Sequence, residues 1–163
     1  MPSETDRIVK TTVLHAPLDR VWSAVSDATQ FGTWFGAEFD APFSPGARMT
    51  GRIRPTQVDA EVAALQAPHD GMPFVVMIEA IEPLRRFAFR WHPYAVESHD
   101  YDSEPTTLVE FVLAAVPGGT ELTVTESGFD AVPIERRAAA FAANEGGWTH
   151  QLVLIGKFLA RPE

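Results

Sequence analysis

The chain has 163 residues, of which 45% are hydrophobic and 21% are charged, a composition typical of a globular protein with a sizeable core. It has 22 acidic and 13 basic residues, and the resulting net charge of -9 disfavours a nucleic-acid backbone or an anionic membrane surface as a partner. It has no cysteine, which excludes disulfides, thiolate metal sites and cysteine nucleophiles and fits a cytoplasmic protein.

The sequence predicts neither export nor a membrane span. Residues 1–10 lack the apolar core of a signal peptide, and no stretch approaches the roughly 18 consecutive apolar residues that cross a membrane. No internal repeat or linker-like segment divides the chain. We therefore expect residues 1–163 to form one cytoplasmic domain.

The N-terminal part predicts a strand followed by two short helices. Residues 8–15 mix β-branched and polar side chains and end before a proline, which is typical of a strand closed by a turn. Pro17 and Asp19 suit the first turn of a helix that runs to about Asp27. A second short helix or turn is expected over residues 29–34.

The middle of the chain predicts antiparallel strands. Apolar and polar residues alternate over residues 46–54, which indicates a strand. Residues 55–73 fit either a short helix or a continued strand. Residues 74–81 and 86–92 predict two further strands, and the second places three aromatic side chains on one face, Phe87, Phe89 and Trp91.

A hairpin with one unusual acidic residue follows. Residues 106–116 and 120–127 predict two strands joined by a Pro-Gly-Gly turn. Along the second strand, Glu126 shares its face with two apolar residues, Leu122 and Val124. Because that face should pack in the core, Glu126 is expected to point inward near the end of the strand.

The last element predicted is a long amphipathic helix over residues 133–160. At about 100° per residue, Glu145 falls within the apolar stripe and Asn144 at its margin. Glu145 is therefore expected on the buried face. The stripe itself consists of Phe141, Trp148, Leu152, Ile155 and Leu159.

Two features of this helix need an explanation. Gly146 and Gly147 should each cost about 1 kcal/mol in a helix interior, so we expect them to admit a close neighbouring segment or a bend. Leu154 and Phe158 lie off the apolar stripe, which indicates either deeper enclosure or a homodimer contact, and we favour the homodimer.

Four segments together resemble the START-like (SRPBCC) superfamily, and within it the activator of heat-shock protein 90 ATPase homologue-like family. They are HAPLDRVWSAVSDATQFGTWFG, IEPLRRFAFRW, TTLVEFVLAAVPGGTELTVTESGF and NEGGWTHQLVLIGKFL, and their order and spacing cover nearly the whole chain. The resemblance implies an α+β helix-grip fold. In that fold a curved antiparallel sheet of about seven strands surrounds a long C-terminal helix, and two short helices close one end of a hydrophobic cavity.

The candidate site combines aromatic side chains with two carboxylates. The aromatic residues are expected to line a cavity for an apolar or aromatic ligand, with a filled core as the alternative. Glu126 and Glu145 are expected to face each other as a ligand anchor or acid–base pair, with solvent contact or an arginine partner as the alternative. The expected lining residues are Trp34, Phe35, Phe89, Trp91, Phe111, Glu126, Glu145, Trp148 and Leu152.

Other chemistries have little support. The five histidines show no metal-ligand spacing, and the one dense donor cluster, HDYD at residues 99–102, is typical of a solvated acidic loop. The sequence has no nucleophile-elbow, dinucleotide or P-loop motif. We expect no metal and no cofactor.

Three functions remain. The first is a non-enzymatic small-molecule-binding protein with Trp148 as a wall of its cavity and Glu126 or Glu145 as its polar anchor. The second is an enzyme of the cyclase or hydrolase type that uses the glutamate pair. The third, which the resemblance implies, is a chaperone-associated or stress-response protein.

Overall fold

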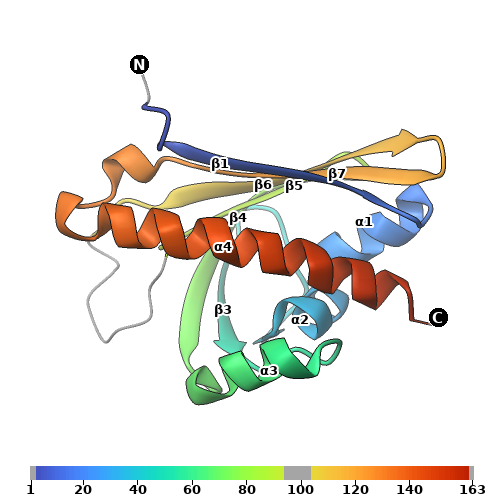
Figure 1. The fold of residues 1–163 in the computed structure, drawn as a ribbon, viewed down its shortest axis with the longest axis horizontal. Helices are drawn as coiled ribbons and strands as arrows, with labels where there is room; N and C mark the ends of the chain where they lie inside the picture. The colour runs from blue at the N-terminus through green and yellow to red at the C-terminus, as the bar shows by residue number, and fades with distance from the viewer. Residues whose placement is uncertain (1–2, 94–103, 162–163) are drawn as a thin grey trace.

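The computed structural model describes residues 3–93 and 104–161 and has the α+β helix-grip fold that the sequence predicts (Figure 1). It contains seven β-strands in the described residues. They are β1 Arg7–Leu14, β2 Ala37–Phe39, β3 Arg48–Ile53, β4 Pro73–Glu82, β5 Arg86–Trp91, β6 Thr107–Val116 and β7 Gly119–Ser127.

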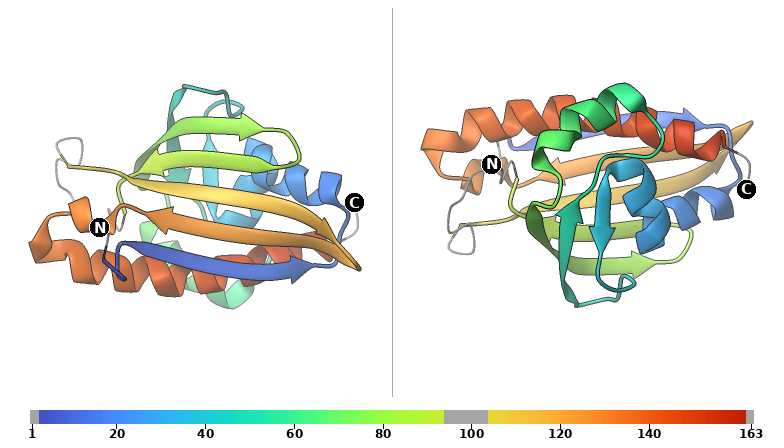
Figure 2. Two further views of the ribbon diagram at one scale, coloured as in Figure 1. Left: turned by 90° about the horizontal axis from the view of Figure 1, so that it is seen from above. Right: turned by 90° about the horizontal axis from the view of Figure 1, so that it is seen from below.

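The strands form one antiparallel sheet in the order β1-β7-β6-β5-β4-β3-β2. The N-terminal strand β1 is therefore an edge strand that pairs with β7 near the end of the chain. Figure 2 shows the sheet as one twisted layer with α4 along one of its faces. This arrangement confirms the predicted sheet around a long C-terminal helix.

Four α-helices accompany the sheet in the part of the chain that the structure describes. The side chain of Asp27 caps the second of them by accepting a hydrogen bond from the backbone N–H of Gln30 at 2.9 Å. Gly36 ends the same helix in the left-handed conformation, with φ of 97°. The helices are α1 Leu18–Ser26, α2 Ala28–Phe35, α3 Ala60–Gln66 and α4 Ile134–Leu159.

The segment that the sequence left open, residues 55–73, contains a helix rather than a continued strand. Asp59 starts α3 because its side chain accepts a hydrogen bond from the backbone N–H of Val62 at 3.0 Å. The 3₁₀ turn Ala67–His69 follows α3 and leads to β4. The sequence also missed β2, whose three residues are too few to show an alternating pattern.

The core lies between the sheet and the helices. Along α4, Trp148, Leu154 and Ile155 are buried, and Phe158 is 9% exposed. The guanidinium group of Arg20 in α1 lies 5.0 Å from the ring centre of Phe158. Leu154 and Phe158 are thus enclosed by their own chain, so they give no support for the homodimer contact that we favoured from the sequence.

Within residues 3–93 and 104–161, no helix combines the length and apolar character that crossing a membrane requires.

Candidate functional site

The carboxylate of Glu126 is the centre of a buried polar cluster. Glu126 lies in β7 on the same face as Leu122 and Val124, as predicted, and its side chain is fully buried. A buried carboxylate is costly unless hydrogen bonds satisfy it, so its partners decide its role.

Four neutral side chains donate hydrogen bonds to Glu126. The indole N–H groups of Trp148 and Trp91 each donate at 2.8 Å, to Oε1 and Oε2 respectively. The hydroxyl of Thr107 donates to Oε2 at 2.5 Å, and the amide of Asn144 donates to both oxygens at 2.9 and 3.1 Å. Because a carboxylate offers about four acceptor positions, these bonds satisfy it, and no described lysine or arginine contacts it.

The cluster joins three strands to the long helix. Trp91 in β5 lies directly opposite Thr107 in β6, which places both beside Glu126 in β7. Asn144 and Trp148 are one turn apart on α4 and reach the carboxylate from the helix side. The cluster therefore links α4 to β5, β6 and β7 through one buried carboxylate.

The two tryptophans of this cluster contact each other and the ring of Phe35. The ring centres of Trp91 and Trp148 are 5.9 Å apart, and the Phe35 ring lies 6.1 Å from each. Trp148 and Phe35 are buried, whereas Trp91 is only partly buried. Two further predicted lining residues contact these tryptophans: the ring centres of Phe111 and Trp148 are 5.7 Å apart, and those of Phe89 and Trp91 are 5.2 Å apart. We call Trp91, Trp148 and Phe35 the aromatic trio.

The other predicted lining aromatics belong to the packed core. Trp34 is buried and donates its indole N–H to the carbonyl oxygen of Ala24 at 2.8 Å. Phe89 and Phe111 are also buried, and both contact the ring of Phe31. The cavity found among the rings of this region has a volume of only about 10 Å³, which is room for about one water molecule.

Glu145 does not face Glu126, so the expected carboxylate pair is wrong. Its side chain is 45% exposed and accepts a hydrogen bond from the Lys10 ammonium of β1 at 3.1 Å. Glu145 follows Asn144 directly, and the rotation of about 100° between them carries it to the other flank of α4. An acid–base mechanism that uses both glutamates at one ligand position therefore has no structural support.

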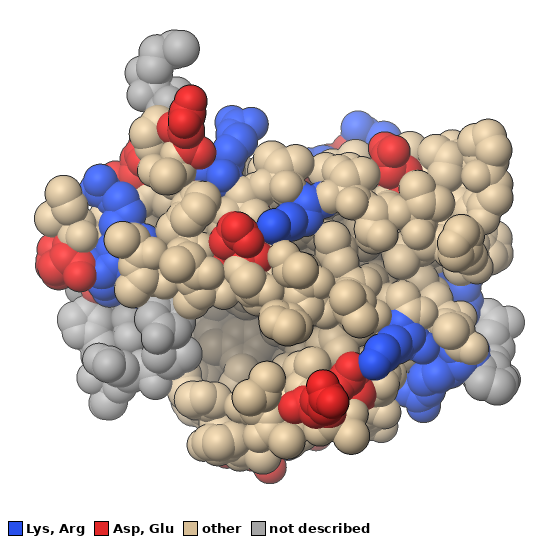
Figure 3. Space-filling view, in the orientation of Figure 1, with Lys and Arg blue, Asp and Glu red and all other residues tan. Residues whose placement is uncertain are grey.

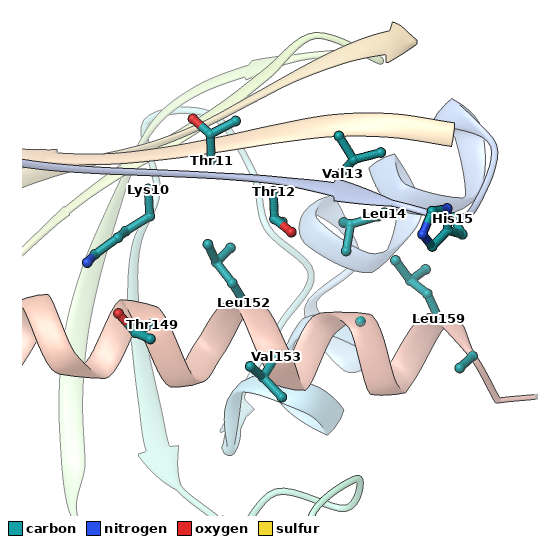
Figure 4. Close-up of a pocket in the computed structure, with 12 residues that line it drawn as sticks. Lys10, Thr11, Thr12, Val13, Leu14, His15, Thr149, Leu152, Val153 and Leu159 are labelled. Carbon is teal, nitrogen blue, oxygen red and sulfur yellow. The ribbon is translucent and has the colours of Figure 1, made fainter. Parts of the chain in front are cut away.

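Leu152 also lies on the β1 flank of α4. It borders a groove of about 580 Å³ between β1 and α4, and in Figure 4 its side chain points toward β1 while Lys10 points toward α4. Leu152 is therefore separate from the aromatic trio on the other flank.

The glycine pair marks an open space beside α4. Ala140, Gly147 and Leu154 follow one another at intervals of seven residues, so they lie in one row along the helix. Ala140 and Leu154 are fully buried, yet a Cβ placed on Gly147 would meet no described atom within 4 Å. No described segment approaches either glycine closely. The structure therefore contradicts the expectation that the two glycines admit a close neighbouring segment.

Figure 3 shows the surface hollowed between α4 and α3. Gly147 lies on the same flank of α4 as Asn144, three residues before it, and Gln151, four residues after it. Gln151 donates to the carbonyl oxygen of Phe35 in α2 at 3.1 Å, which identifies this flank as the one facing α2. We call the space next to Gly147 on this flank the α4 hollow.

Two glutamines hold the end of α2 beside the α4 hollow. The carbonyl oxygen of Phe35 accepts hydrogen bonds from Gln151 of α4 and from Gln66 of α3, both at 3.1 Å. The Oε1 atom of Gln151 is buried and has no hydrogen-bond partner. Gln151 therefore carries a buried acceptor that no described group uses.

Helix α3 has no fully buried residue, although Val62 packs partly buried against the core. The Lys157 ammonium of α4 donates a hydrogen bond to the carboxylate of Asp59, the residue that caps α3. This bond, together with the backbone N–H of Val62, lowers the pKa of Asp59 below its ordinary value of 3.8. The ion pair thus ties α3 to the C-terminal half of α4.

Sequence reasoning missed three polar residues of the site, Thr107, Asn144 and Gln151. Thr107 could have been found, because alternation along β6 places it on the same face as Val109. The HDYD cluster at residues 99–102 lies outside the described residues. Within the described ranges, no group of three or more histidine, aspartate or glutamate side chains could hold a metal ion.

Solved structures share this fold. DynU16, from the dynemicin biosynthetic locus, is 25% identical with a TM-score of 0.66; the match covers 94% of this chain but only 47% of DynU16, so the chain spans about half of that protein's length. A Bordetella parapertussis protein encoded by gene BPP1335 is 25% identical with a TM-score of 0.67, and the match covers 99% of this chain and 79% of that one.

A third structure, MLL2253 from Mesorhizobium loti, is 20% identical with a TM-score of 0.70, and the match covers 96% and 98% of the two chains. At this identity the likeness establishes the fold alone. None of the curated proteins compared with this chain matches it.

A family model described as Activator of Hsp90 ATPase homolog 1-like protein matches residues 15–160. This match, which spans most of the chain and agrees with the predicted START-like fold, establishes that the chain belongs to the Activator of Hsp90 ATPase homolog 1-like protein family.

Proposed function

We propose that this chain binds a small apolar or aromatic molecule in the α4 hollow. The observation that carries the proposal is the open space at Gly147, midway between the fully buried Ala140 and Leu154 on the same row of α4. A helix that packs at both ends of a row and leaves its middle free has room there for a bound molecule, and ligand sites are concave spaces of this kind.

The chemistry of the surrounding side chains supports an apolar ligand. Trp91 is the partly buried member of the aromatic trio, so part of its surface remains uncovered. Covering such surface contributes about 25 cal/mol per Å². A flat aromatic molecule would gain further from ring contacts.

The glycine pair offers a matched test of where the ligand lies. Gly146 and Gly147 are both free of described neighbours, but only Gly147 lies on the flank of the α4 hollow. N-phenyl-1-naphthylamine, an uncharged dye that fluoresces in apolar sites, is the probe. Gly147→Leu should weaken its binding about tenfold or more by filling the α4 hollow, whereas Gly146→Leu should leave its affinity unchanged.

Two results would reject the proposal. One is the absence of any fluorescence increase with the wild-type chain at probe concentrations up to its solubility. The other is an equal effect of the two leucine substitutions, which would place the probe elsewhere. Circular dichroism of both variants checks that α4 remains helical.

The family's description favours a second candidate, contact with a heat-shock chaperone. The test is the ATPase rate of purified Hsp90 with and without a molar excess of this chain. A rate increase that requires the chain would support the contact, and an unchanged rate would remove it.

A further inference from the structure

We propose that the ligand of the α4 hollow carries hydrogen-bond donors, a hydroxyl or a protonated amine, on an aromatic body and has no anionic group. This inference rests on the proposed function, because it specifies the chemistry of a molecule bound at that same site. Two acceptors carry it: the Glu126 carboxylate, which Asn144 bonds on one side of Gly147, and the Oε1 atom of Gln151 on the other side.

The first acceptor is the carboxylate of Glu126. It is fully buried, and all four of its donors are neutral side chains, so no described cation balances its charge. In a poorly solvated site, an anionic ligand group near this carboxylate would be repelled. A ligand hydroxyl or ammonium would instead gain a charge-assisted hydrogen bond, which is stronger than a neutral one.

Asn144 is the donor that a ligand can replace. Its amide divides its hydrogen bonds between the two carboxylate oxygens, whereas each indole N–H makes one bond of 2.8 Å from a ring held by packing. Asn144 is also only partly buried and lies on the α2-facing flank of α4. A ligand donor in its place would leave the carboxylate satisfied.

The second acceptor is Oε1 of Gln151, which is buried without a partner. The amide nitrogen of Gln151 is held by the carbonyl oxygen of Phe35, so the amide orientation that leaves Oε1 free is fixed by a hydrogen bond. Gln151 follows Asn144 by seven residues, or about 10.5 Å along the helix axis, with Gly147 between them. A molecule beside Gly147 therefore lies between Asn144, whose amide it would displace from Glu126, and Gln151, whose amide nitrogen is already bonded to Phe35.

Three probes that share one ring system test the inference. They are 2-naphthylmethanol, 2-naphthylmethylamine, which is protonated at neutral pH, and 2-naphthoate, which is an anion there. Calorimetric titration of the wild-type chain should give affinities for the alcohol and the amine that are about tenfold or more above that for naphthoate.

Two variants test whether Glu126 is the acceptor. Asn144→Ser removes the competing amide, so it should strengthen binding of the amine several-fold without strengthening that of naphthoate. Glu126→Gln should reduce the preference for the amine over naphthoate. Glu145→Gln is the matched control, because it removes a carboxylate on the opposite flank of α4 and should change none of the three affinities.

The outcomes separate the inference from the function on which it rests. If no naphthalene probe binds, the proposed function fails. If all three bind equally, or naphthoate binds best, the α4 hollow holds a ligand but the donor requirement is wrong. If the alcohol and amine are preferred and Asn144→Ser leaves that preference unchanged, Glu126 is not the acceptor. Because Asn144→Ser keeps the carboxylate and its other three donors, the test stands even where Glu126→Gln does not fold.

Discussion

The indole N–H of Trp148 donates a hydrogen bond to Glu126 at 2.8 Å, and this bond connects the long helix α4 directly to strand β7. Trp34 makes a bond of the same length, but to a neutral backbone carbonyl oxygen. The two tryptophans are almost equally buried, at 2% and 1% exposed. They therefore allow the effect of the acceptor's charge to be tested at matched bond length and burial.

Trp148→Phe should destabilise the chain more than Trp34→Phe. Both substitutions keep an aromatic ring and remove one N–H donor, but only the first leaves a buried carboxylate with one donor fewer. We expect a loss of about 1.5–3 kcal/mol for Trp148→Phe and about 0.5–1.5 kcal/mol for Trp34→Phe, apart from a similar loss of packing in both. Urea denaturation measures the difference, and an equal or reversed order would show that the carboxylate does not depend on Trp148.

The glycines of the helices should respond in opposite directions to alanine. A Cβ at Gly147 in α4 would meet no described atom within 4 Å, so Gly147→Ala should stabilise the chain by about 0.5–1 kcal/mol through helix propensity alone. A Cβ at Gly32 in α2 would lie 2.1 Å from the carbonyl oxygen of Ala37. Gly32→Ala should therefore destabilise by about 1–3 kcal/mol.

Thermal and urea denaturation of the two alanine variants measure these changes. A destabilised Gly147→Ala variant would mean that the space beside α4 is not open in solution. Such a result would also weaken the proposed ligand site, which depends on that space.

The ion pair between Asp59 and Lys157 should make stability depend on acid pH. The pKa of Asp59 is lowered in the folded chain, mainly by its hydrogen bond from Lys157, so the carboxylate is favoured by folding. Its contribution is present above the unfolded-state value, near 3.8, and is lost as the pH falls through the lower folded-state value.

Asp59→Asn removes this contribution while keeping a good helix cap for α3. We expect the variant to be less stable than the wild type at pH 7 and the gap in urea midpoint to narrow as the pH falls below about 4. Lys157→Met should show the same trend because it removes the other partner. A gap that stays constant down to pH 2 would exclude the ion pair as its cause.

The sequence was sufficient to place Glu126 but not to choose its partner on α4. Alternation along one strand has only two faces, so the apolar neighbours Leu122 and Val124 decided the direction of Glu126. A helix has a broad buried face, and Asn144 and Glu145 lie about 40° and 60° to either side of Trp148. Which of them meets β7 depends on where β1 lies, and that is a property of the assembled sheet.

The sequence also could not show whether the aromatic side chains fill the core or leave a cavity between them. The residue types of Trp34, Phe89 and Phe111 fit either a core or a cavity wall, because both need large apolar side chains. The rings around Phe31 leave only about 10 Å³ open, since many side chains from distant segments converge there. The α4 hollow lies instead beside Gly147, and the missing side chain of this glycine was the signal for it in the sequence.

Adjacent alanine substitutions on α4 test the assignment of Asn144 and Glu145 directly. Asn144→Ala removes a donor from the buried Glu126 carboxylate, so we expect a loss of about 1–3 kcal/mol. Glu145→Ala removes a partly exposed ion pair with Lys10, for which we expect a loss of about 0–1 kcal/mol. Both positions lie inside the same helix, and alanine improves its propensity in both cases, which makes the pair a fair comparison. Urea denaturation at pH 7 measures the two losses, and a larger loss for Glu145→Ala would mean that Glu145, rather than Asn144, supports the buried cluster.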